Sequence, residues 1–254
     1  MEKKICCICF YGATRTLAKT IDNIKKYIID EFKNNFEVKI FIHTWKTNEE
    51  TINDYKLVNP DYYELTDQSL LELDIEKYIK SLDNHYLNYD YKKLIPGLLY
   101  GLYSLKQVSL LMLSKIKNPD YVVFLRPDSK FEKFPSISNL INLHNSKSDQ
   151  LQIITASFDN FYFKKDLGYA IRSKDGTGGA NDRFAICCGS KAAEIYGTRY
   201  DRLNEYSKKY VSIPEIFLEW VIFKNKIKNI KSKDICFKLL RNDGTETGDC
   251  LIDD

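Results

Sequence analysis

The sequence has few prolines, no long apolar run and almost no excess charge of either sign. It contains 6 Pro in 254 residues, with 44% apolar and 29% charged residues, which excludes collagen-like and disordered low-complexity chains. No stretch approaches the roughly 20 apolar residues of a membrane span, and the apolar run near the N-terminus is too short for a signal peptide. We therefore expect a soluble globular protein that has no transmembrane segment. Any contact with a membrane would be peripheral.

The small net charge argues against a nucleic-acid-binding protein. The 38 basic and 35 acidic residues leave a net charge of +3, whereas dedicated nucleic-acid binders carry a larger and more segregated positive charge. One segment departs from this balance, because residues 224–241 hold seven basic residues and a single acidic one, Asp234. This segment is either a solvated surface or a patch that binds phosphate groups or an anionic surface.

The cysteines point to a reducing compartment. There are seven, an odd number, and most lie in apolar runs that predict buried strands. The neighbours Cys6-Cys7 and Cys187-Cys188 would point to opposite faces of a strand, so they cannot easily form disulfides with each other. Cys6 and Cys9 have C-x-x-C spacing, but they lie inside a predicted strand and no second ligand pair accompanies them, which argues against a zinc site. We expect free thiols and a cytoplasmic protein.

Strands and helices alternate along the first half of the chain, which predicts an α/β fold with a mainly parallel central sheet flanked by helices. Short apolar runs predict strands at residues 5–11, 38–42, about 62–63, 121–125, 151–156, 183–188 and 235–240. Apolar residues at helical spacing predict helices at 17–28, 96–116, 136–143, 190–196 and 214–223. No internal repeat or linker divides the chain, so we expect one continuous domain over residues 1–254.

Polar residues follow several predicted strands at the points where those strands end. Ligands of open α/β sheets bind beyond the carboxyl ends of the strands, which makes these residues the candidates for a site. They are Gly12, Thr14 and Arg15 after the first strand, His43 and Trp45 after the second, Arg126 and Asp128 after the strand at 121–125, and Asn181 and Asp182 before the strand at 183–188. In a parallel sheet the first three groups converge on one edge.

The chemistry of these residues suits a nucleoside diphosphate. Gly12 lets the backbone approach a ligand closely, and Arg15 and Arg126 can pair with diphosphate oxygens bidentately. Asp128 can hold a divalent cation that bridges two phosphates. Trp45 either stacks on a base or sugar or packs in the core.

Other residues of the set have plainer alternatives. Arg15 can be a surface arginine, and Asp128 a turn residue after a strand. Asp182 can be a loop or cap aspartate, and His43 is as well explained by a hydrogen-bonded structural histidine.

The order of these motifs resembles that of GT-A-type glycosyltransferases, in particular sugar transferases of large DNA viruses and bacterial polysaccharide clusters. The resemblance covers about residues 4–240 and rests on strand-Gly-x-x-Arg, strand-His-Thr-Trp, strand-Arg-Pro-Asp and Asn-Asp-Arg-Phe. It implies a nucleotide-binding half over about 1–130 and an acceptor half over about 131–254, with a nucleotide-sugar donor and a glycan or other hydroxyl acceptor. For a viral source, the cytoplasm would be that of the host.

The resemblance also implies site residues and a cofactor. In GT-A enzymes the central strand ends in an Asp-x-Asp motif that binds a metal and the donor diphosphate. Asp128 matches one Asp of this motif and would hold Mn²⁺ or Mg²⁺, whereas Arg126 stands in place of the other. An arginine there can neutralise the diphosphate directly and replace part of the role of the metal.

A carboxylate must take the proton of the acceptor hydroxyl in an inverting transfer, and Asp182 is the predicted catalytic base. Glu215 and Glu219 are second choices for that role, and the Gly-rich loop at 176–180 is predicted to close over the donor. Gly12, Thr14, Arg15 and Asn181 would lie beside the nucleotide. A sugar nucleotidyltransferase and a non-catalytic nucleotide- or sugar-binding protein are the two alternatives, since a fold alone does not define an activity.

Overall fold

The computed structural model describes residues 3–46, 50–82, 89–144, 150–157, 161–164, 169–172, 180–210 and 213–247. Most of the predicted Gly-rich loop, residues 176–179, lies outside these ranges. Within them, no helix is long and apolar enough to cross a membrane.

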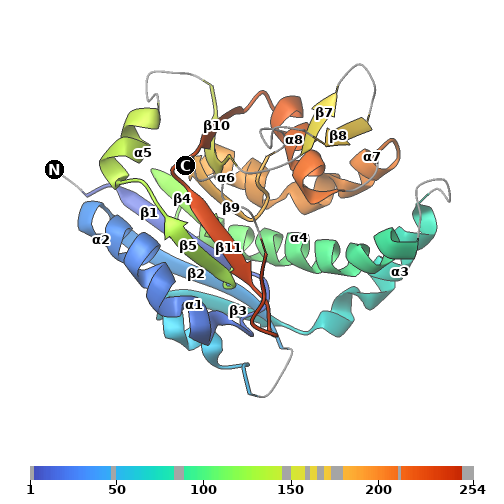
Figure 1. Cartoon of the computed structure of the whole chain (residues 1–254), viewed down its shortest axis with the longest axis horizontal. Coiled ribbons are helices and arrows are strands. Elements are labelled where there is room, and N and C mark those ends of the chain that lie inside the picture. The colour runs from blue at the N-terminus through green and yellow to red at the C-terminus, as the bar shows by residue number, and fades with distance from the viewer. Residues whose placement is uncertain are drawn as a thin grey trace.

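A seven-stranded sheet forms the centre of the molecule (Figure 1). Its strands are β1 (Ile5–Tyr11), β2 (Glu37–Trp45), β3 (Tyr62–Thr66), β4 (Tyr121–Leu125), β6 (Gln152–Ala156), β9 (Phe184–Cys188) and β10 (Lys228–Ser232). They are arranged in the order β10-β6-β9-β4-β1-β2-β3, and only β9 runs antiparallel to its neighbours. The predicted α/β class with a mainly parallel sheet is confirmed. The carboxyl ends of six strands and the start of β9 therefore share one edge.

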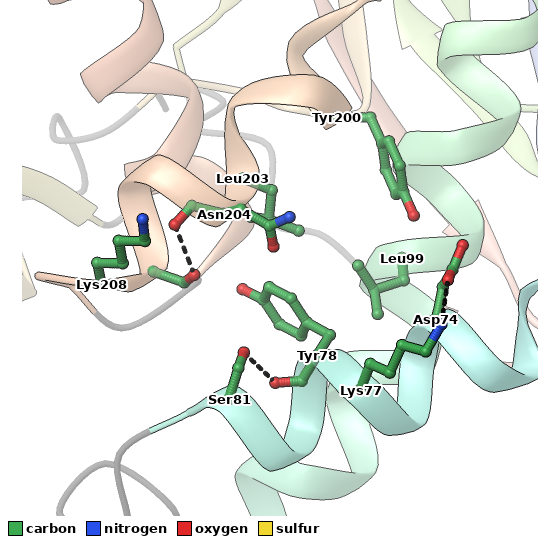
Figure 2. Close-up of a pocket in the computed structure, with 10 residues that line it drawn as sticks. Asp74, Lys77, Tyr78, Ser81, Leu99, Tyr200, Leu203, Asn204 and Lys208 are labelled. Carbon is green, nitrogen blue, oxygen red and sulfur yellow. Dashed lines mark hydrogen bonds and ion pairs between the residues drawn. The ribbon is translucent and has the colours of Figure 1, made fainter.

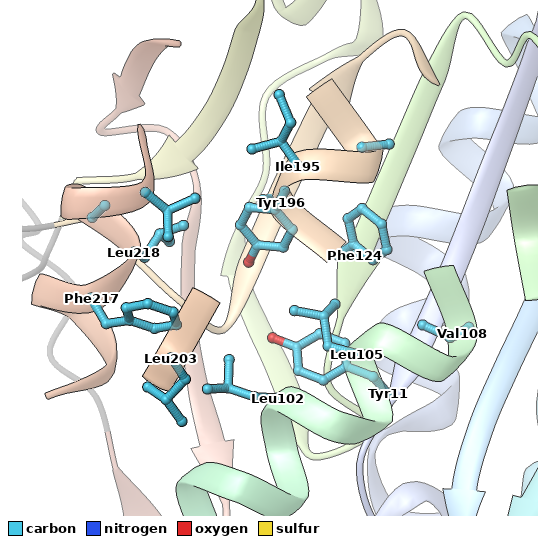
Figure 3. Close-up of a cluster of buried hydrophobic side chains, with 14 of the residues drawn as sticks. Tyr11, Leu102, Leu105, Val108, Phe124, Ile195, Tyr196, Leu203, Phe217 and Leu218 are labelled. Carbon is cyan, nitrogen blue, oxygen red and sulfur yellow. The ribbon is translucent and has the colours of Figure 1, made fainter. Parts of the chain in front are cut away.

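Helices cover both faces of this sheet because its strands are apolar on both sides. Alternate residues of β1 belong to two separate cores: Cys7, Cys9 and Tyr11 to one, and Cys6, Ile8 and Phe10 to the other. The first core packs against α4 (Tyr89–Lys115), α6 (Ser190–Gly197) and α8 (Pro214–Lys224), and Figure 3 shows a part of it. The second packs against α1 (Leu17–Ile24), the π-helical turn η1 (Lys25–Ile29), α2 (Asp30–Asn35) and α5 (Ile137–Leu143).

The remaining helical segments lie outside these two layers or link them. They are η2 (Asp54–Val58), η3 (Gln68–Leu71), α3 (Glu72–Ser81), η5 (Arg199–Arg202) and α7 (Leu203–Ser207). In Figure 1, α3 and α7 lie at the same end of the molecule, beyond α4. Three of them, α3, η5 and α7, line the cavity described below together with α4.

Helix α4 differs from its predicted start. Pro96 was expected to open the helix but lies inside it. A proline in a helix interior loses one backbone hydrogen bond and costs about 3 kcal/mol. Its neighbours Ile95 and Leu99 are 1% and 3% exposed, so burial of the apolar face outweighs this cost.

A second sheet brings the C-terminal part of the chain to the end of β4. It consists of β5 (Ser129–Lys133), β11 (Cys236–Leu240) and β12 (Glu246–Thr247), and β11 is antiparallel to both of its neighbours. The backbone N–H of Leu240 donates to the carbonyl of Asp128 at 2.8 Å. A separate hairpin joins β7 (Phe161–Lys164) to β8 (Tyr169–Arg172).

Most of the described cysteines match the expectation of free thiols. Cys6, Cys7, Cys9 and Cys187 are buried and free, and Cys188 is half-buried and free. Cys236 is disulfide-bonded, so the expectation of free thiols throughout the chain is wrong.

Candidate functional site

The candidate site lies at the shared edge of the sheet, and Gly12 forms its first turn. Gly12 follows β1 with φ of 104°, a left-handed conformation that side chains other than glycine rarely adopt. Its N–H donates to the hydroxyl of Ser104 on α4 at 2.7 Å. A glycine is therefore required here by the backbone conformation of the turn.

Arg126 and Asp128 form a bidentate ion pair in the turn after β4. The guanidinium donates from Nε to Oδ1 at 2.9 Å and from Nη2 to Oδ2 at 2.6 Å. Burial by itself would lower the pKa of Arg126, but the charge and hydrogen bonds of Asp128 outweigh it and hold the pKa above its usual value. The Thr20 hydroxyl on α1 donates to the carbonyl of Pro127 at 2.6 Å, which fixes the turn.

Three further arginines lie near this ion pair, Arg15, Arg183 and Arg241. Arg241 directly follows β11, at the point where that strand is hydrogen-bonded to the backbone of Asp128. Its pKa is lowered by burial and by the positive charges of Arg126, Arg183 and Arg15, while Asp128 acts in the opposite direction. Neighbouring positive charges repel one another unless an anion compensates them. The cluster of Arg15, Arg126, Arg183 and Arg241 is hereafter the arginine cluster.

Three buried side chains hold the backbone of Asp182 in place through hydrogen bonds. Its carbonyl oxygen accepts hydrogen bonds from Tyr11 Oη at 2.8 Å, Tyr196 Oη at 3.2 Å and Arg199 Nη2 at 3.3 Å. Tyr11 and Tyr196 extend from β1 and α6 into the same apolar cluster (Figure 3). Burial raises the pKa of Tyr11 to about 12, so its phenol keeps the proton that it donates. Asp182 is thereby fixed at the edge of the sheet.

Asp182 and Glu215 form a carboxylate pair with Arg183 beside them. Arg183 Nη2 lies 3.5 Å from Glu215 Oε1, and its Nε lies 3.9 Å from Asp182 Oδ1. Burial of the Glu215 side chain and the nearby Asp182 carboxylate raise the pKa of Glu215 to about 7, against a smaller lowering by Arg183. A carboxyl group with a pKa near neutrality can accept and release a proton under physiological conditions.

Thr14, Arg15 and Asn181 lie at the same edge in different environments. Thr14 is buried and donates to the carbonyl of Thr51 at 3.3 Å, whereas Arg15 is exposed. Asn181 is fully buried, and its Oδ1 accepts from the N–H groups of Arg183 and Phe184 at 2.9 and 3.1 Å. Its amide nitrogen has no partner in the described part of the chain. Their roles beside a nucleotide stay predictions.

His43 is enclosed by protein groups. Its Nδ1 lies 2.8 Å from Ser104 Oγ and its Nε2 lies 2.9 Å from Thr66 Oγ1. The Ser104 hydroxyl also lies 3.1 Å from the His43 carbonyl. Burial lowers the pKa of His43 to about 4, which keeps the ring neutral. Both ring nitrogens are occupied, which favours the structural alternative for this residue.

Trp45 packs in the core at the end of β2. It is 2% exposed, and its ring stacks on Tyr103 at 5.7 Å and meets Tyr100 edge-on at 5.3 Å. Stacking of Trp45 on a ligand therefore needs a rearrangement of α4 side chains, so the core alternative fits this placement better.

The residues around Asp128 do not fit the predicted cation site. Both carboxylate oxygens of Asp128 already accept hydrogen bonds from Arg126. Nowhere in the described ranges do three His, Cys, Asp or Glu side chains form a group that could hold a metal ion. A divalent cation would also have to approach four arginines, which is electrostatically unfavourable. The chemistry of this edge suits an anion instead.

The sequence pattern missed two arginines that the fold brings to the site. Arg183 stands in the Asn-Asp-Arg-Phe motif beside Asn181 and Asp182, but the sequence pattern alone indicates no role for it. Arg241 ends the basic segment 224–241, for which a phosphate-binding patch was one of two alternatives. A signal for Arg241 was thus present, but only the pairing of β11 with β5 shows that it adjoins Asp128.

No protein-family model matches this chain, and no curated protein is significantly similar in sequence. Among solved structures, the chain is similar to mouse xyloside xylosyltransferase 1, with a TM-score of 0.48 and 10% identity over 92% of this chain and 86% of that one. It is also similar to a Bacillus anthracis protein assigned as a glucose-1-phosphate thymidylyltransferase and crystallised with sucrose (TM-score 0.45, 10% identity, 92% and 89% coverage). Both TM-scores are below 0.5, so neither similarity transfers a function to this chain.

Proposed function

We propose that this protein is a GT-A-type glycosyltransferase that moves a sugar from a nucleotide-diphosphate sugar to a hydroxyl group of an acceptor. One observation carries the proposal: the arginine cluster and the Asp182–Glu215 pair meet at the edge of the sheet where the strands end. Positive charge at this place suits a diphosphate, and a carboxylate with a pKa near 7 suits proton transfer.

The donor would bind through its diphosphate. Arginine presents a planar fork of N–H groups that matches phosphate oxygens in a bidentate manner. Arg126 and Arg241 are the best placed, since Arg126 is partly buried and bonded to Asp128, and Arg241 follows the residue whose N–H donates to the Asp128 carbonyl. The glycine turn at Gly12 leaves the adjoining backbone accessible to a nucleotide.

The sugar-transfer step would involve both the positive arginine cluster and the negative Asp182–Glu215 pair. The acceptor oxygen attacks the anomeric carbon while the bond from that carbon to the diphosphate oxygen breaks. The diphosphate leaves with the electron pair, and the arginine cluster stabilises the negative charge that develops on it. The acceptor proton goes to the Asp182–Glu215 pair, where burial keeps the carboxyl group of Glu215 near the pKa of an efficient base.

Calorimetric titration with UDP, GDP, dTDP and CDP tests the donor site. The titration is done with wild-type protein, Arg126→Ala, Arg241→Ala and the control Arg202→Ala, since Arg202 makes no hydrogen bond or ion pair within the described part of the chain. We expect one nucleotide to bind, each cluster variant to weaken its Kd about tenfold or more, and the control to match the wild type. Absence of binding by all four nucleotides would refute the proposal.

Assays of product release then distinguish between the activities that this site could have. The sugar conjugates of the nucleotide that binds are incubated with the protein, and release of nucleoside diphosphate is measured. We expect Asp182→Asn and Glu215→Gln to slow release by about 100-fold or more while nucleotide affinity stays unchanged. Pyrophosphate release from a nucleoside triphosphate and a sugar 1-phosphate would instead identify a nucleotidyltransferase. Binding without any release would identify a non-catalytic protein.

A further inference from the structure

A cavity of about 590 Å³ opens between α3, α4, η5 and α7 (Figure 2). Pockets for small ligands have volumes of about 300–1,000 Å³ and combine apolar and aromatic walls with a few polar groups. This cavity lies on the α4 side of the central sheet and contains none of the residues assigned to the donor site.

The lining of the cavity is amphipathic. Leu99, Leu203 and Tyr78 form buried walls, being 3%, 2% and 6% exposed. In Figure 2 the rings of Tyr78 and Tyr200 and the amide of Asn204 face the same space. The side chain of Asn204 makes no hydrogen bond within the described part of the chain, so its donor and acceptor atoms are available to a ligand.

Charge in the cavity is largely balanced. Asp74 and Lys77 face each other across one turn of α3, with Lys77 Nζ 3.9 Å from Asp74 Oδ1. Lys208 lies on the opposite wall. Such a lining does not select a strong anion, in contrast to the arginine cluster, but it offers both donors and acceptors to hydroxyl groups.

Two structural links join this cavity to the edge of the sheet. Arg199 donates to the carbonyl of Asp182, and the next residue, Tyr200, lines the cavity. Tyr200 also packs edge-on against Tyr103 at 5.8 Å, and Tyr103 stacks on Trp45 at the end of β2. These contacts connect one wall of the cavity to residues at the edge of the sheet.

We propose that this cavity binds a pyranose unit of the acceptor glycan. This inference rests on the proposed function and adds the place and the chemical class of the acceptor. A pyranose has an apolar face of C–H groups that packs against aromatic rings, as Tyr78 and Tyr200 offer. Its hydroxyl groups need both hydrogen-bond donors and acceptors, and Asn204, Lys208 and the hydroxyl of Tyr200 supply them. Binding here would hold the remainder of the acceptor near Asp182.

Saturation-transfer NMR with three simple sugars tests the cavity directly. The probes are methyl β-D-glucopyranoside, methyl β-D-galactopyranoside and methyl α-D-mannopyranoside. The proteins are wild type, Asn204→Trp, which fills the cavity, and Glu205→Trp, which places the same ring at an exposed neighbour of the same helix. We expect saturation transfer to at least one probe with wild type and Glu205→Trp, and a loss of about tenfold or more with Asn204→Trp. Circular dichroism and the melting temperature show that each variant is folded.

The donor site provides an independent readout. Nucleoside diphosphate titration should give the same affinity for Asn204→Trp as for wild type, because the filled cavity lies apart from the arginine cluster. The cavity proposal would be overturned if none of the three sugars showed saturation transfer in the NMR experiment, or if Asn204→Trp showed as much as wild type. Either result would leave the donor site intact. A loss of nucleotide affinity in Asn204→Trp would also overturn it, since the cavity would then belong to the donor. Failure of Arg126→Ala to weaken nucleotide binding concerns only the proposed function.

Discussion

The stability of this protein should depend on the ionisation of Glu215, and replacing that residue with Gln should reveal the dependence. The Glu215 side chain is 13% exposed, and its burial together with the Asp182 carboxylate raises the pKa from 4.5 to about 7. Glutamine has nearly the same shape and no charge, so Glu215→Gln resembles the protonated form at every pH. The variant thus separates the charge of the residue from its packing.

The sign of the effect follows from which state binds the proton more tightly. Between pH 4.5 and about 7, Glu215 is protonated in the folded protein but ionised in the unfolded chain. The folded state binds more protons than the unfolded state in this range. The contribution of Glu215 to the free energy of unfolding therefore falls as the pH rises. The difference between the pKa of Glu215 in the unfolded chain and in the folded protein corresponds to a loss of about 3 kcal/mol in the free energy of unfolding. This loss is complete above pH 7. The variant does not suffer this loss.

Urea denaturation of wild type and Glu215→Gln between pH 5 and 8.5 measures the difference. We expect the variant to gain free energy of unfolding relative to wild type as the pH rises, and the gain to level off above about pH 7. For a protein of this size each kcal/mol corresponds to about 2–4 °C in melting temperature, so thermal melts provide a second readout. The control is Glu205→Gln, whose side chain is 63% exposed and which should show no such trend. A difference between wild type and Glu215→Gln that is constant over the whole pH range would refute the reasoning.

Three further predictions concern the backbone and the anion site. Gly12→Ala should lower the free energy of unfolding by about 1–2 kcal/mol because φ is 104°, whereas Gly101→Ala inside α4 should raise it by about 0.5–1 kcal/mol in the same denaturation assay. Gly197→Ala should destabilise by about 1–3 kcal/mol, because the added Cβ overlaps the Ser109 side chain; unchanged stability would contradict this packing. Nucleoside diphosphate affinity should be the same in EDTA as in Mg²⁺ or Mn²⁺, and Asp128→Asn should bind at least as tightly as wild type, because Arg126 is released. A Kd that requires the metal and is weakened in Asp128→Asn would restore the cation site.

Local patterns in the sequence were sufficient to predict most of the central sheet. β1 and β4 coincide with the apolar runs at 5–11 and 121–125, because a strand covered on both faces is apolar throughout. β10 was not predicted, since it lies at the edge of the sheet and is polar, with the sequence KNIKS. β5 was also missed, because only its pairing with a distant strand, β11, makes the segment after Asp128 extended.

The candidate site was only partly predictable for a related reason. The residues that follow a strand, such as Gly12 and Arg126, can be located once the strand is recognised. Contacts between distant segments cannot be located in this way. The hydrogen bond from Tyr11 to Asp182, for example, spans 171 residues. Arg241 reaches the site through the second sheet, and the raised pKa of Glu215 depends on burial that only the packed structure supplies.

The balance of charge at the edge of the sheet explains how so many ionised groups can lie together before a ligand arrives. The arginine cluster carries four positive charges, and Asp128, Asp182 and Glu215 carry at most three negative ones. Asp128 engages Arg126 with both oxygens, and Glu215 faces Arg183, so two of the four arginines have a carboxylate partner, whereas burial and the neighbouring positive charges still lower the pKa of Arg241. A diphosphate presents the same paired oxygens to a guanidinium as a carboxylate does. Under the proposed function, a diphosphate would therefore compete with Asp128 for the guanidinium of Arg126.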